Sequence, residues 1–66
     1  MRLTVNGTER QVAATTVAQL IGELSLESHE FLALSRNGAI VKRTDWTATG
    51  LAEGDIIDIL TIVGGG

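Results

Sequence analysis

The feature that most constrains this chain is the run of residues 56–63, Ile-Ile-Asp-Ile-Leu-Thr-Ile-Val. Aliphatic and β-branched residues fill the run almost completely, which is typical of a β-strand. Apolar residues fall on both of its alternating faces, so the strand either is covered twice or exposes an apolar patch. With only 66 residues in the chain, we expect one small domain built around this strand.

One carboxylate distinguishes the two faces of the strand. Asp58 lies in the middle of the run, and a carboxylate is almost never fully buried without a partner. The side of the strand that carries Asp58 is therefore predicted to be open, and the other side to face the core. The open set is Ile56, Asp58, Leu60 and Ile62, and the core set is Ile57, Ile59 and Thr61.

The rest of the chain supplies shorter strands and turns. Leu3 and Val5 alternate with polar residues, and Asn6-Gly7 and Asn37-Gly38 are two-residue hairpin signals, because both residue types tolerate positive φ. Strands are expected at residues 2–6, 8–13, 31–36, 39–41 and 56–63, with Val12 as the apolar anchor of the second.

One amphipathic helix is predicted over residues 17–25. Thr16 and Gln19 have the spacing of a capping box, in which each side chain bonds to the other's backbone. Apolar residues then recur at the helical spacing, at Val17, Leu20, Ile21 and Leu24.

These elements predict an α+β domain over residues 1–63, in which the helix packs on one face of a mixed sheet of about five strands. The first and last strands have the strongest apolar patterns and are expected in the middle. A single short helix covers only one face. The other face is either partly covered by loop 42–50 with Trp46, or it is a docking surface for another protein.

Composition excludes several classes of function. The chain has no cysteine, so it has no disulfide and no thiolate chemistry, and 5 basic residues against 8 acidic ones make it a poor ligand for nucleic acid. It contains no apolar run long enough to cross a membrane and no secretory signal, so we expect a cytoplasmic protein. A chain this small, with His29 as its one histidine, is not expected to be an enzyme or to bind a metal or cofactor.

The last third of the chain is acidic. From Thr44 onward the charged residues are all carboxylates, at positions 45, 53, 55 and 58. They indicate either a partner that is basic near its docking site or simply solvated turn residues.

The chain ends in Gly64, Gly65 and Gly66, directly after the last strand. Glycines form a thin, flexible segment, here one that ends in a carboxylate. Transfer of AMP from ATP would convert that carboxylate into an anhydride that a sulfur nucleophile can attack, inside the site of a partner enzyme. The alternative is an inert, frayed terminus.

The whole chain resembles the ThiS/MoaD family of the ubiquitin-like β-grasp fold, and within it the ThiS sulfur carriers of thiamine biosynthesis. The residues that carry the resemblance are Leu3–Gly7, Thr16-Val17…Leu20, Asn37-Gly38…Ile40-Val41…Arg43…Trp46, Leu51…Glu53-Gly54-Asp55 and Val63-Gly64-Gly65-Gly66. Relatives often have proline where this chain has Lys42.

The resemblance implies a role for the tail. A ThiF-type enzyme, using ATP and Mg²⁺, would adenylate the Gly66 carboxylate, and a sulfur-donor protein would supply the sulfur of a thiocarboxylate. Thiazole synthase (ThiG) would then accept that sulfur. Gly64 and Gly65 would thread into the partner's channel. Apart from the resemblance, the open side of the last strand predicts a docking surface centred on Leu60 and Ile62, which comprises Ile56, Asp58, Leu60, Ile62 and Val63. A MoaD-like subunit of molybdopterin synthase and a non-catalytic interaction domain remain as alternatives.

Overall fold

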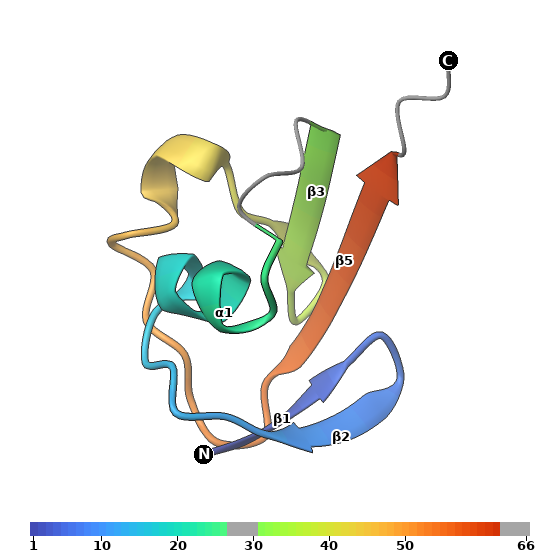
Figure 1. Ribbon diagram of the computed structural model, residues 1–66, viewed down its shortest axis with the longest axis vertical. Helices are drawn as coiled ribbons and strands as arrows, with labels where there is room; N and C mark the ends of the chain where they lie inside the picture. Colours follow the sequence, from blue (N-terminus) through green and yellow to red (C-terminus); the bar gives the residue numbers. More distant parts are fainter. Residues whose placement is uncertain (27–30, 63–66) are drawn as a thin grey trace.

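The computed structural model describes residues 1–26 and 31–62, and it shows one helix packed against one sheet (Figure 1). Along the chain, the α-helix lies between the two hairpins, and the 3-10 helix lies between the second hairpin and the last strand. The elements are β1 (Arg2–Val5), β2 (Thr8–Gln11), α1 (Val17–Glu23), β3 (Phe31–Arg36), β4 (Ala39–Ile40), the 3-10 helix Arg43–Asp45 and β5 (Ile56–Ile62).

The five strands form one mixed sheet in the order β2-β1-β5-β3-β4. β5 lies parallel to β1 and antiparallel to β3, and the two hairpins form the outer pairs. The predicted α+β class and the interior position of the first and last strands are therefore confirmed. Helix α1 lies across one face of this sheet (Figure 1).

Both predicted hairpin turns have the backbone that their residues favour. Asn6 and Gly7 have φ values of 50° and 82°, and Asn37 and Gly38 have 51° and 88°. Two consecutive residues with positive φ are typical of the type I′ turn, whose twist matches that of the flanking strands. The turns thus fix the register of β1 with β2 and of β3 with β4.

The start of α1 follows the predicted cap with one difference. The Thr16 hydroxyl accepts a hydrogen bond from the Gln19 amide at 3.2 Å, as expected. The Gln19 side chain, however, accepts from the Thr15 amide at 2.8 Å rather than from Thr16. The first bond satisfies the Gln19 amide, one of the amides at the helix start that have no partner within the helix, and the second satisfies the Thr15 amide just before the helix.

The helix ends at Glu23, two residues earlier than predicted. Ser25 adopts a positive φ of 59°, and the Leu26 and Ser25 amides donate to the carbonyls of Ile21 and Gly22 at 2.9 and 3.1 Å. This pair of bonds is a Schellman motif, which usually has glycine in the position of Ser25. The prediction was wrong here because the apolar spacing continues to Leu24 while no glycine marks the end.

Strand β2 also ends earlier than predicted, at Gln11 instead of residue 13. Val12 is buried, so its predicted role as an apolar anchor is confirmed, but it lies outside the strand. Its amide donates to the Met1 carbonyl at 2.8 Å, and the N-terminal ammonium donates back to the Val12 carbonyl at 2.7 Å. The chain then turns toward α1, and Ala14 joins the core.

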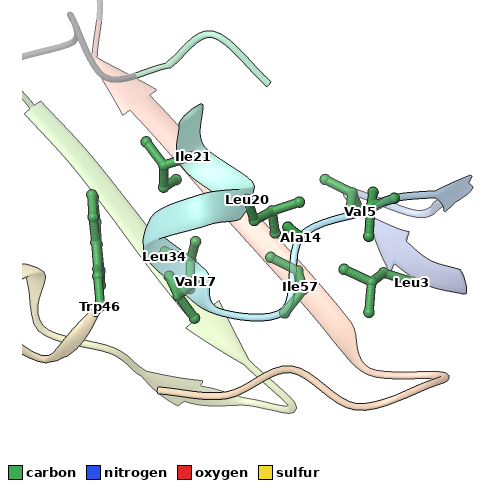
Figure 2. Packing of buried hydrophobic residues seen from close by; sticks show 10 residues of the cluster. Leu3, Val5, Ala14, Val17, Leu20, Ile21, Leu34, Trp46 and Ile57 are labelled. Atoms are coloured by element: carbon green, nitrogen blue, oxygen red, sulfur yellow. The ribbon is translucent and has the colours of Figure 1, made fainter. Parts of the chain in front are cut away.

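The hydrophobic core lies between α1 and the sheet (Figure 2). Trp46 lies at one end of the core and is only 7 % exposed. Its indole N–H donates to the Val41 carbonyl at 3.0 Å. Its backbone carbonyl accepts from the Ala18 amide at 3.1 Å, which ties the Trp46 segment to the helix. The suggestion that the Trp46 loop covers the open face of the sheet is therefore wrong. The buried residues are Leu3, Val5, Val12, Ala14, Val17, Leu20, Ile21, Leu34, Trp46 and Ile57.

Candidate functional site

The open face of the sheet carries an apolar patch along β5. Ile56 is 51 % exposed and Leu60 is 65 % exposed, and Asp58 between them is exposed as well. On the opposite side, Ile57 is completely buried and Ile59 packs against the edge of the core. The prediction that the face with Asp58 is open and the other faces the core is thus confirmed for the side chains of β5 that the structure describes.

A second strand extends this patch. The register pairs Ser35 of β3 with both Ile40 of β4 and Asp58 of β5, which places the three residues in one row on the open face. Ile40 is 72 % exposed, and Ala33 lies opposite Leu60 in the neighbouring row. A shallow groove of about 350 Å³ runs between the side chains of Ile40 and Leu60.

Ile40 and Ala33 were not predicted as part of the docking surface. The signal was present, because a two-residue turn at Asn37-Gly38 fixes Ile40 opposite Ser35. Since Leu34 is buried, its neighbour Ser35 points to the open face, and Ile40 must share that face. The alternation within a single strand does not show this shared face, because it depends on the pairing of two strands.

The other half of the open face is polar. Leu3 and Val5 of β1 face the core, so Arg2 and Thr4 face outward, opposite Gln11 and Glu9 of β2. The apolar part is therefore confined to β5, β3 and β4. We refer to Ile40, Ile56 and Leu60, with Ala33 between them, as the open-face patch.

Two of the four late carboxylates are structural and do not form a continuous acidic surface. The Glu53 carboxylate accepts from the Arg2 amide at 3.0 Å. Asp55, only 6 % exposed, accepts from Arg36 Nε at 2.7 Å, from Asn37 Nδ2 at 3.0 Å and from the Ala52 amide at 2.8 Å. Asp55 thus connects the turn before β5 to the β3–β4 hairpin, and Asp45 and Asp58 remain exposed.

The environment of Asp55 lowers its pKa. Burial by itself raises the pKa of this carboxyl, because it disfavours the charged form. The hydrogen bonds from Asn37, Ala52 and Arg36, together with the positive charge of Arg36, outweigh that effect and bring the pKa below its ordinary value. The charged form is therefore the one that stabilises the fold.

We expect Asp55→Ala to lower the free energy of unfolding at pH 7 by roughly 1–3 kcal/mol, because three donors lose a buried acceptor. A lowered pKa adds stability that is present above the unfolded value of about 4 and is lost as the pH falls through the folded value. Urea titrations of the wild type should therefore show a loss of stability below about pH 4 that is smaller in the variant.

Asp58→Ala is the matched control for this experiment. It removes an exposed carboxylate from the same strand, so the expected change is within about 0.5 kcal/mol. If Asp55→Ala and Asp58→Ala changed stability equally, the structural role of the Asp55 cluster would be refuted.

The structure leaves part of the predicted site without a description. Ile62 is paired with Phe31 at the end of β5, but its side chain is not described. Val63, Gly64, Gly65 and Gly66 lie outside the described residues, as does His29. What the structure does place is the strand that leads to them, and that strand carries part of the open-face patch.

Residues 1–26 and 31–62 contain neither a metal-binding cluster nor a membrane-spanning helix. No group of three or more histidine or acidic side chains in these ranges is arranged to hold a metal ion. None of the helices in the same ranges has the length and apolar character needed to cross a bilayer.

Comparison with known proteins identifies relatives over the full length of the chain. The model of the ThiS family matches residues 3–66, which includes all three terminal glycines. A crystal structure of a thiamine biosynthesis protein (ThiS) from Geobacter metallireducens is 32 % identical, with a TM-score of 0.83 over 100 % of both chains. A solution structure of a thiamine biosynthesis protein from the same organism has a TM-score of 0.81 and 32 % identity, over 100 % of this chain and 88 % of the other.

One curated relative is much longer than this chain. A protein named thiazole synthase, from Paramagnetospirillum magneticum (strain ATCC 700264 / AMB-1), is 37 % identical over 67 residues. The match covers 100 % of this chain but only 20 % of that protein. The chain therefore spans about a fifth of the length of this relative.

Proposed function

Because this chain belongs to the ThiS family of small carrier proteins, we propose that it carries sulfur for the synthesis of the thiazole ring of thiamine, on the carboxylate of Gly66. The observation that carries the proposal is that the family match continues through Gly64, Gly65 and Gly66. The two ThiS-like structures add support, because they share the fold over the whole chain.

The chemistry takes place in a partner enzyme of the ThiF type. A Gly66 carboxylate oxygen attacks the α-phosphorus of ATP, pyrophosphate leaves with Mg²⁺, and an acyl adenylate forms. Sulfur at the sulfide level, delivered by a donor protein, attacks the acyl carbon, and AMP leaves. The product is a thiocarboxylate, whose sulfur passes to thiazole synthase (ThiG).

The folded domain contributes binding rather than catalysis. Ordering three tail residues costs roughly 1–2 kcal/mol each, and more for glycine than for other residues. Docking of the open-face patch offsets this cost, because burial of exposed aliphatic side chains favours association. We propose that the docking surface combines Ile56 and Leu60 of this patch with Asp58, Ile62 and Val63 of the same segment, that Ile40 and Ala33 extend it, and that docking takes place in the cytoplasm.

The direct test is intact mass of the carrier after incubation with a ThiF-type enzyme, ATP, Mg²⁺ and a sulfur donor. The proposal expects the mass change of one oxygen replaced by sulfur at Gly66, and no change when ATP is omitted. As a positive control, the same enzyme preparation should convert a carrier that it is known to act on. If that control succeeds and the mass of this chain stays unchanged with its tail intact, the proposal is refuted and an inert domain is favoured.

Docking can be tested separately with Leu60→Asp. The side chain is 65 % exposed, so the fold should tolerate the change, while a charge in the middle of the open-face patch should weaken binding to the activating enzyme by about 2 kcal/mol or more. Calorimetric titration measures the affinity. Gln11→Asp adds the same charge on the polar half of the face and should have little effect. Equal affinities for Leu60→Asp and the wild type would remove Leu60 from the interface.

A further inference from the structure

Strand β5 extends well beyond the strand that pairs with it on one side. The parallel pairing with β1 covers only Ile56 and Ile57, whereas the antiparallel pairing with β3 continues to Ile62. Figure 1 shows β5 continuing past the end of β1 toward the C-terminus, with β3 on its other side. The second half of β5 therefore has one paired side and one open side.

The hydrogen bonds show which backbone groups are left on the open side. The Asn6 amide donates to the Ile57 carbonyl at 2.9 Å, and the Asn6 side chain accepts from the Ile59 amide at 2.7 Å. Alternation along a strand then places the Ile59 carbonyl and both backbone groups of Thr61 on the same side. Within residues 1–26 and 31–62, no hydrogen bond to these three groups occurs.

This open segment differs from the outer edges of the sheet. An exposed strand edge is a template for pairing, and proteins protect such edges with charged residues or by keeping the strand short. β2 carries Glu9 and Arg10, and β4 has two residues. The open segment of β5 around Ile59 and Thr61 has neither protection, since its residues are apolar or uncharged and the strand is long.

A groove accompanies the open segment on the helix side of the sheet. Its volume is about 320 Å³, and its apolar lining includes Leu24, Leu26 and Ile59. Arg10 and Glu23 lie on its rim, but the Glu23 carboxylate already accepts from the Ala13 and Ala14 amides. No salt bridge of Arg10 occurs among the described residues.

We propose that the enzyme that activates the tail adds one of its own strands to the open edge of β5, at Ile59 and Thr61. This proposal rests on the proposed function, because the tail follows β5 directly and must be extended when the enzyme binds it. The added strand would direct an aliphatic side chain toward Leu24, Leu26 and Ile59, next to a carboxylate for Arg10. It is a second contact, distinct from the open-face patch.

Amide hydrogen exchange of the ¹⁵N-labelled carrier tests this pairing without any substitution. In the free carrier we expect the Thr61 amide to exchange fast, and on saturation with a ThiF-type enzyme, without ATP, to slow by about tenfold or more. The Ile59 amide, already bonded to Asn6, should change much less. A Thr61 amide that exchanges at the same rate in the saturated complex would overturn the inference.

Two variants at one position provide the second test. Thr61→Pro removes the outward N–H and leaves the bonds to β3 intact, and proline is tolerated where the N–H of a strand faces solvent. It should weaken binding to the enzyme by about tenfold, whereas Thr61→Val, which keeps the N–H, should bind within about twofold of the wild type. Equal binding of the two variants would count against the added strand. Should Thr61→Pro fail to fold, the exchange experiment decides.

The tests of the added strand and of the sulfur-carrier role can fail independently of each other. A wild-type carrier that forms the thiocarboxylate but shows no protection of Thr61 refutes the added strand alone. A carrier that binds with protection of Thr61 but never gains sulfur refutes the proposed function alone. Protection by thiazole synthase and none by the activating enzyme would also overturn the inference as stated.

Discussion

A carrier shortened by Gly65 and Gly66 should form no thiocarboxylate and should melt at nearly the same temperature as the full chain. The reacting carbon in the proposed function belongs to Gly66, so its removal leaves nothing that can react at the correct distance from ATP. The core, by contrast, is made of residues between Leu3 and Ile57, none of which is altered. Intact mass after the activation assay and thermal denaturation measure the two effects.

The shortened carrier also separates docking from chemistry. Its open-face patch is unchanged, so it should bind the activating enzyme and inhibit the conversion of full-length carrier when added in excess. A shortened chain that failed to compete would show that binding depends on the tail rather than on the sheet. A large fall in melting temperature would contradict the view that the domain is stable without its last two residues.

Ile57→Ala should have the largest effect on stability, a loss of about 2–5 kcal/mol, because it removes a completely buried side chain from the central strand. A domain of this size has roughly 3–5 kcal/mol of net stability, so the variant should be close to unfolding at 25 °C. Urea denaturation followed by the fluorescence of Trp46, which is buried and is the one tryptophan of the chain, measures the change.

The matched control is the adjacent residue. Ile56→Ala makes the same chemical change on the open face, where the side chain is 51 % exposed, and should cost well under half as much. Ile59→Ala should fall between the two, because Ile59 packs only at the edge of the core. An Ile57→Ala variant no less stable than Ile56→Ala would mean that the faces of β5 are assigned the wrong way round.

Local patterns were sufficient to predict most of the fold. The Asn-Gly pairs fix both hairpins, because few other residues accept two successive positive φ values. The Thr16 cap fixes the start of the helix, and Asp58 identifies the open side of β5. Each of these rules acts within a few residues, so no knowledge of the tertiary structure was needed.

The features that were missed depend on contacts between distant segments. The side of the sheet that Trp46 covers is set by its bonds to Val41 and to Ala18 on the helix, which no local pattern shows. The sequence suggests that Asp55 is a solvated turn residue, yet its side chain is buried. Arg36 and Asn37, which are 19 and 18 positions away in the chain, donate hydrogen bonds to its carboxylate. Of the open-face patch, Ile56 and Leu60 were predicted, but Ile40 was not, because only the pairing of β4 with β3 places it on the same face.

The position of β5 between two others also has a mechanical consequence. The six residue pairs from Phe31↔Ile62 to Arg36↔Ile57 lie side by side along the axis of β5. If a partner holds the tail, as proposed, a pull along that axis would act on all six pairs. A force in this direction is shared in shear by the hydrogen bonds of all these pairs, whereas a force across the strands would break the bonds one after another from a free end. In the proposed function, this arrangement would let the domain resist a pull on its C-terminal end when the activating enzyme binds that end.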